Sequence, residues 1–335
     1  MVDRVSARDT DWDGVRLHVV TGKGGTGKTT VAAALALALA AGGRRVLLVE
    51  VEGRQGIAQL FDVPPLPYEE RRVAVAPDGG DVHALAVDTE EALIEYLEMF
   101  YNLKRAGKAM TKLGIVDFVT TIAPGLRDVI LTGKTSESVR RRNKDGSFIY
   151  DAVVMDAPPT GRITKFLNVN EEVSGLAKVG PVRNHADTVM KVVRSPETAV
   201  HFVTLLEEMP VQETMDGIHD LREAGLPVGG VFVNMEHKPV LPPDALAAAA
   251  AGELDTDEIV RGVKAAGLEN GAERIAAVLV AEAAEHARRT TLQAREKERL
   301  ESLDIPRYTL PLLPHGMDLA GLYTLAEAIR TQGAA

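Results

Sequence analysis

Residues 22–29 read GKGGTGKT and fit the phosphate-binding pattern G-x-x-x-x-G-K-[ST]. Glycines let the backbone adopt positive φ, so that its N–H groups wrap around phosphate oxygens. In such a loop Lys28 reaches the β and γ phosphates, Thr29 binds Mg²⁺ and Thr30 donates to the α phosphate. The residues predicted to bind nucleotide here are Gly22, Lys23, Gly24, Gly25, Thr26, Gly27, Lys28, Thr29 and Thr30.

A second chemical signal is an apolar segment that ends in a carboxylate. Residues 150–167 read YDAVVMDAPPTGRITKFL, so that Asp156 closes the apolar run. The carboxyl end of a parallel strand lies at the edge where sheets of this kind bind ligands. We therefore expect Asp156 to order Mg²⁺ through water, beside Thr29.

The elements that must position these residues alternate between apolar strands and helices. This rhythm predicts an α/β fold with a mostly parallel sheet flanked by helices, and the phosphate-binding motif indicates that it is a P-loop NTPase. Strands are expected at 15–20, 45–51, 82–87, 151–156, 201–206, 228–234 and 307–313.

Domain boundaries follow from where this rhythm is interrupted. We predict a flexible tail at 1–14 and one nucleotide-binding domain at 15–335. Helical subdomain insertions are expected at about 89–147 and 168–197, and a helical segment at about 241–300.

Composition excludes several classes of protein and site. The net charge of −10 disfavours nucleic acid as a partner, and the absence of cysteine excludes thiolate zinc sites and disulfides. The N-terminal residues do not resemble a signal peptide, and the longest apolar run, 31–41, is too short to span a bilayer. We expect a cytoplasmic protein that could still contact a membrane peripherally.

The two lysines of the glycine-rich loop carry a family resemblance. KGGTGKTT resembles the deviant Walker A motif of the SIMIBI ATPases, and DAPPTGRITKFL resembles the second switch of the ArsA-type ATPases. That family includes arsenite-pump ATPases and targeting factors for tail-anchored membrane proteins, and this chain is most similar to its bacterial, cysteine-free members. The resemblance implies ATP as substrate and a face-to-face dimer in which Lys23 contacts the partner's nucleotide. A solvated loop lysine is the alternative.

Two further segments resemble parts of the family's base-binding site. VFVNM ends in Asn234, and LPLLPHGMDLAGL contains Pro314. The resemblance implies that both residues contact adenine. Taken alone, each would more often be a structural cap or a turn.

The first switch departs from the family pattern S-T-D-P-A-H, because equal spacing places Glu52 where the aspartate is expected. We hypothesise that Glu52 orients the attacking water, with Lys23 and Lys28 completing the catalytic set. The extra methylene would displace the carboxylate, and such misplacement can slow an enzyme by roughly a hundredfold. The alternative is that Glu52 only pairs with Arg54 or Arg44.

The sequence says less about the client, the molecule that such an ATPase would handle. Without cysteine, the family's zinc clasp and its thiolate site for arsenite have no counterpart, so we expect no zinc. An apolar stripe within 89–135 could be a client groove or simply helix-helix core, and the basic run at 140–144 could touch lipid or be a solvated loop. The residues of the stripe are Leu93, Leu97, Met99, Phe100, Met110, Phe118 and Ile122.

The function that these features predict is that of an ATP hydrolase. We expect a dimer, formed with itself or with a paralogous subunit, that couples ATP binding and hydrolysis to opening and closing around a hydrophobic or membrane-associated client. The alternatives are a weakly hydrolysing regulatory scaffold paired with a paralogue, the ATPase subunit of an anion efflux system, and a partition-type ATPase.

Overall fold

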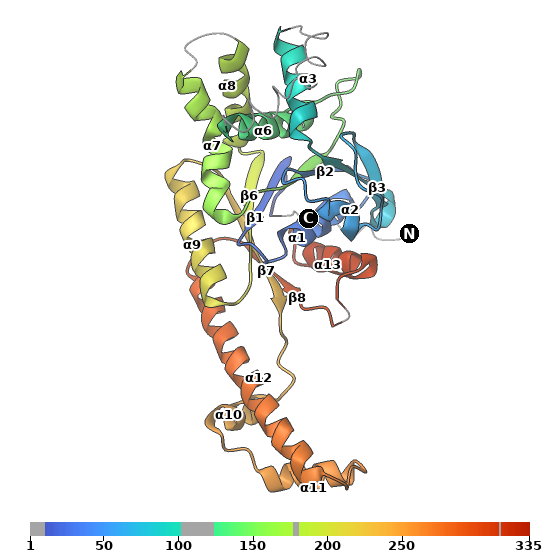
Figure 1. Ribbon diagram of the computed structural model, residues 1–335, viewed down its shortest axis with the longest axis vertical. Helices are drawn as coiled ribbons and strands as arrows, with labels where there is room; N and C mark the ends of the chain where they lie inside the picture. The colour runs from blue at the N-terminus through green and yellow to red at the C-terminus, as the bar shows by residue number, and fades with distance from the viewer. Residues whose placement is uncertain (1–10, 102–123, 177–180, 315) are drawn as a thin grey trace, which may run out of the picture.

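The computed structural model describes residues 11–101, 124–176, 181–314 and 316–335 (Figure 1). Eight strands form one sheet in the order β3-β4-β2-β5-β1-β6-β7-β8. They are β1 (Leu17–Gly22), β2 (Arg45–Glu50), β3 (Arg71–Val75), β4 (Asp81–Ala86), β5 (Ala152–Asp156), β6 (Thr198–Thr204), β7 (Val228–Glu236) and β8 (Arg307–Pro311).

The sheet confirms the predicted fold class, because every neighbouring pair is parallel except β3 with β4. The expected strands lie within three residues of those observed, but β3 was not expected. Its sequence, RRVAV, opens with two exposed arginines and lacks the continuous apolar character of the buried strands. It is an antiparallel edge strand, for which one solvated face is normal.

Helices cover both faces of the sheet (Figure 1). The core on one face joins α1, α2 and α13 to the strands, and that on the other joins α3, α6–α9 and the end of α12. The helices are α1 (Lys28–Ala40), α2 (Gly56–Leu60), α3 (Thr89–Tyr101), α6 (Pro124–Arg140), α7 (Thr160–Leu176), α8 (Pro181–Val193), α9 (Glu208–Glu223), α10 (Pro243–Ala251), α11 (Thr256–Ala265), α12 (Ala272–Glu301) and α13 (Leu319–Thr331), with a 3₁₀ turn η1 (Pro77–Gly79).

Helix α1, which follows the phosphate loop, is packed on all sides. Every residue from Val31 to Ala40 is buried, which explains why its sequence is apolar all round rather than amphipathic. The phosphate loop is therefore held by a helix that cannot tilt without disturbing the core.

Helices occupy the segments where they were expected. Asp88 caps α3, since its Oδ1 accepts from the backbone N of Glu90 and of Glu91, both at 2.9 Å. Within the predicted apolar stripe, Leu93 is core at 3% exposed. Three of the other six, Met110, Phe118 and Ile122, lie outside the described residues, and for Leu97, Met99 and Phe100 only the backbone of α3 is described. The choice between groove and core therefore stays open for these six.

The C-terminal end of the predicted flexible tail, 1–14, contacts the folded domain. Trp12 packs edge-on against the His201 ring, with centroids 4.9 Å apart, and Asp11 accepts a hydrogen bond from the Tyr308 hydroxyl at 2.7 Å. These contacts attach residues 11 and 12 to the sheet. Residues 1–10 lie outside the described residues.

Residues 241–286, here called the helical arm, extend away from the sheet at the opposite end of the molecule from α3 and α8 (Figure 1). The arm comprises α10, α11 and the first half of α12, and both shorter helices pack against α12. The second half of α12 returns to the sheet beside α9. No helix in the described part of the chain is both long and apolar enough to cross a membrane.

Candidate functional site

The phosphate loop joins the end of β1 to the start of α1. Gly22, Gly25 and Gly27 adopt φ values of 152°, 88° and 86°, conformations that other residues rarely adopt. A Cβ at Gly22 would lie 2.2 Å from the carbonyl oxygen of Val203, so this position also requires glycine for space. Helix α1 begins at Lys28 with no capping side chain among the described residues, which leaves its N-terminal N–H groups for an anion.

Asn234, near the carboxyl end of β7, holds the phosphate loop in place through a hydrogen bond. Its Nδ2 donates to the carbonyl oxygen of Thr26 at 2.9 Å, and a Cβ on Gly27 would lie only 2.5 Å from that nitrogen. Asn234 is 3% exposed, so this hydrogen bond is shielded from water. The structure thus gives Asn234 a structural role beside the predicted contact with adenine, which stays a prediction.

Pro314, the other predicted base contact, lies on the loop after β8 and is exposed. A contact of Pro314 with adenine stays a prediction.

Thr29 and Asp156 meet as the sequence predicts. The Thr29 hydroxyl donates to Oδ2 of Asp156 at 2.7 Å, although the two residues are 127 positions apart. The other carboxylate oxygen, Oδ1, is buried and has no hydrogen-bond partner among the described residues. A buried oxygen without a partner beside a hydroxyl fits a hydrated Mg²⁺, which prefers oxygen ligands and usually needs only one or two from protein.

Burial raises the pKa of Asp156 from 3.8 to about 6. The hydrogen bond from Thr29 and the charge of Lys28 lower it, while Glu50 and Glu52 raise it further. The carboxylate is therefore costly to hold ionised in the absence of a cation, and a bound cation would remove that cost.

Glu50 is a site residue that the sequence interpretation did not select. It ends β2, pairs in register with Asp156 of β5, and is 2% exposed. Its carboxylate accepts from the backbone N of Ile57 at 3.2 Å and of Gly56 at 3.4 Å. The signal that could have identified it is the one that identified Asp156, a carboxylate at the carboxyl end of a buried parallel strand.

Glu52 lies two residues beyond β2 and is half-buried, with 20% of its side chain exposed. Arg54 lies 3.5 Å from it but is itself 76% exposed. A pair of this kind contributes at most about 1 kcal/mol, so it does not fix the Glu52 carboxylate. The structure places Glu52 close enough to influence Asp156, and both hypotheses for its role remain predictions.

Lys23 is held within the chain rather than extended freely from the loop. Its Nζ lies 2.5 Å from Oε1 of Glu213 on α9, with 30% and 36% of the two side chains exposed. No sequence pattern indicates this pair, because 190 positions separate its members. Lys28 lies in the first turn of α1, where its charge acts on Asp156.

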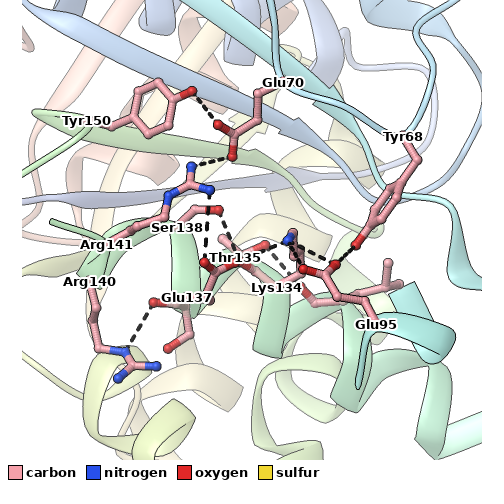
Figure 2. Close-up of polar contacts among 12 residues, drawn as sticks. Tyr68, Glu70, Glu95, Lys134, Thr135, Glu137, Ser138, Arg140, Arg141 and Tyr150 are labelled. Carbon is pink, nitrogen blue, oxygen red and sulfur yellow. Dashed lines mark hydrogen bonds and ion pairs between the residues drawn. The ribbon is translucent and has the colours of Figure 1, made fainter. Parts of the chain in front are cut away.

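Apart from the phosphate loop, a hollow of about 430 Å³ lies between α3, α6 and the residues just before β3, and it is rich in charge. Figure 2 shows how its charges are paired: the Lys134 ammonium lies 2.8 Å from Glu95, which also accepts from the Tyr68 hydroxyl at 2.5 Å. Burial opposes ionisation of Glu95, yet the hydrogen bonds from Lys134 and Tyr68 outweigh it and lower its pKa.

The same network incorporates part of the basic run at 140–144. Arg141 pairs with Glu70, which also accepts from the Tyr150 hydroxyl at 2.7 Å (Figure 2). Because these groups satisfy one another, the network anchors α6 to the edge of the sheet. Arg141 is thus not part of a solvated loop.

Comparison with known proteins identifies ATPases as relatives of this chain. A family model described as "Anion-transporting ATPase" matches residues 15–196. The chain is 56% identical to the ATPase BagA of Mycobacterium tuberculosis over 320 residues, 96% of this chain and 94% of that protein. It is 27% identical to the arsenical pump-driving ATPase of Acidiphilium multivorum over 263 residues, 68% of this chain and 41% of that protein.

Proposed function

Because the chain belongs to the anion-transporting ATPase (ArsA) family and hydrolyses ATP, we propose that it does so as a dimer whose opening and closing handles a hydrophobic or membrane-associated client. The second subunit is another copy or a paralogue. The role would be similar to that of a targeting factor or chaperone.

Within one subunit, each part of the site has a distinct task. The loop N–H groups and Lys28 bind the phosphates, and Thr29 with Asp156 holds the hydrated Mg²⁺. When bound, Mg²⁺ neutralises charge on the phosphate oxygens. Glu52, two residues beyond the carboxyl end of β2, orients the attacking water. Its side chain is one methylene longer than that of the family's aspartate, and this makes turnover slow.

The observation that carries the proposal is the position of Lys23. It belongs to the phosphate loop, yet it pairs with Glu213 at the surface and is 30% exposed. A half-exposed ion pair contributes on the order of 1 kcal/mol or less, so a nucleotide phosphate on a facing subunit could displace Glu213. Lys23 would then act in trans, and hydrolysis would require two subunits.

The test compares three lysine variants in ATP turnover, nucleotide affinity and mass in solution. We expect Lys23→Ala to lower turnover at least a hundredfold with ATP affinity within threefold of the wild type, and to abolish an ATP-dependent dimer. Lys28→Ala should lose nucleotide binding itself. Lys144→Ala, in an exposed turn away from the site, is the control and should change neither.

Two results would contradict the proposal. Turnover that stays proportional to protein concentration, with a monomer throughout, would show that hydrolysis needs no second subunit. Full activity in Lys23→Ala would show that Lys23 only pairs with Glu213 and has no role in trans.

A second candidate is the ATPase subunit of an anion efflux system, favoured by the description of the matched family and by the printed name of the Acidiphilium relative. The chain has no cysteine to ligate arsenite, so an oxyanion would have to bind through other groups. Stimulation of turnover by arsenite or another oxyanion would favour this candidate over a protein client.

A further inference from the structure

The exposed apolar side chains gather beside α12. Eleven large apolar side chains are exposed among the described residues, and five of them line two hollows along this helix. These five are Met235, Val240, Leu279, Leu292 and Leu312. An apolar surface concentrated in a concavity is more often a binding surface than a chance exposure.

The two hollows share two lining residues and are here together called the α12 groove. The first, of about 640 Å³, lies between α12 and the residues that follow β6, β7 and β8. The second, of about 330 Å³, lies between α12 and residues 240 and 241. Glu285 and Arg289 line both, and the groove follows α12 from Leu279 to Gln293, about 21 Å at 1.5 Å per residue.

The arm that carries one end of the groove is strongly acidic. Residues 241–286 contain nine Asp and Glu against three Lys and Arg, a formal charge of −6 within the chain's −10. In the groove itself, three glutamates face two arginines, and one of these arginines, Arg288, pairs with Glu285 at 2.7 Å. The acidic excess lies at the end nearer the arm, where Glu282 and Glu285 face Arg289 alone. This field repels anionic lipid and nucleic acid and attracts a basic partner.

We propose that the α12 groove binds an amphipathic helix of a partner protein, with its aliphatic face on α12 and its basic residues facing the acidic arm. A groove of this length accommodates about four helical turns, the usual size of a helix-in-groove contact. The partner would also reach the nucleotide site, because Met235 follows Asn234 directly and lies near Gly27.

This inference goes beyond the ATPase cycle and does not depend on it. The match to the family model ends at residue 196, so the arm and α12 lie outside the segment that it covers. Binding to the groove is measured without nucleotide, so that its outcome is independent of whether Lys23 acts in trans.

The test uses the full-length protein and two fluorescent peptides of about 18 residues with leucine at helical spacing. One peptide has lysine on its polar face and the other has glutamate. By fluorescence anisotropy at physiological salt, we expect the lysine peptide to bind at least tenfold more tightly than the glutamate peptide.

The matched variants are two neighbours on α12. Leu279 lines the groove and Val278 does not, although both are exposed, at 47% and 57%. Each change to glutamate adds the same charge, so purely electrostatic attraction of the lysine peptide would rise in both. We expect Leu279→Glu to weaken binding at least tenfold, Val278→Glu to leave it within twofold, and Leu292→Ser to weaken it also.

Equal binding of the two peptides, or equal effects of the two glutamate variants, would overturn the proposal. Sedimentation of the protein alone and flotation with phosphatidylglycerol vesicles test other occupants. Self-association or vesicle binding that Leu279→Glu abolishes would show that a second copy or a lipid surface occupies the groove instead.

Discussion

Replacing Asp156 by Asn should stabilise the nucleotide-free protein while removing its activity. Asp156 is 8% exposed, and its pKa is raised from 3.8 to about 6, chiefly by burial. At about 1.36 kcal/mol per pH unit, holding the carboxylate ionised above pH 6 costs about 3 kcal/mol of folding free energy. Asparagine keeps an oxygen to accept from Thr29, but its buried N–H group costs about 1 kcal/mol, so the expected gain is about 2 kcal/mol.

The pH dependence of this gain has a definite sign. The raised pKa means that folding favours the protonated acid, so the penalty is absent below pH 3.8, grows as pH rises and is complete above pH 6. The stability difference between Asp156→Asn and the wild type should therefore shrink by about 2 kcal/mol between pH 7.5 and pH 4.5.

The assay is urea unfolding followed by circular dichroism, in EDTA and without nucleotide, at both pH values. Asp220→Asn, an exposed position on α9, is the control and should stay within about 0.5 kcal/mol of the wild type. ATP turnover with Mg²⁺ should fall at least a hundredfold in Asp156→Asn only. The reasoning would be refuted if Asp156→Asn were no more stable than the wild type at pH 7.5. It would also be refuted if the difference in unfolding free energy between the two proteins did not change with pH.

Three further variants test other parts of the molecule. Burial lowers the pKa of His18 to about 4 and also lowers the pKa of its neighbour His201, so the free energy of unfolding should be highest above pH 6.5 and fall towards pH 4. His18→Gln should remove about 3 kcal/mol of that fall, as measured by urea unfolding. Glu52→Gln should lower turnover at least tenfold with unchanged ATP affinity; equal turnover would leave Glu52 only as the partner of Arg54. Asn234→Ala should weaken ATP and GTP binding equally if Asn234 only holds the loop, and should weaken ATP binding more than GTP binding if it also reads the base, as measured by equilibrium titration.

The sequence alone was sufficient for features that depend on local spacing. The glycines of the phosphate loop, the following helix and the buried strands are all encoded in short runs, since backbone conformation and continuous burial leave a pattern within a few residues. Asp156 and Thr29 could be assigned to one site because both follow strands of a parallel sheet, whose carboxyl ends share an edge.

Only the tertiary structure decided which distant side chains meet. Glu213 pairs with Lys23 across 190 positions, and Asn234 bonds to Thr26 across 208. Such contacts depend on how helices and strands pack after the chain has crossed the sheet several times, and no local pattern records that. The strand β3 and the α12 groove were hidden for the same reason: an edge strand and an exposed groove are defined by the neighbours they lack, which the sequence does not state.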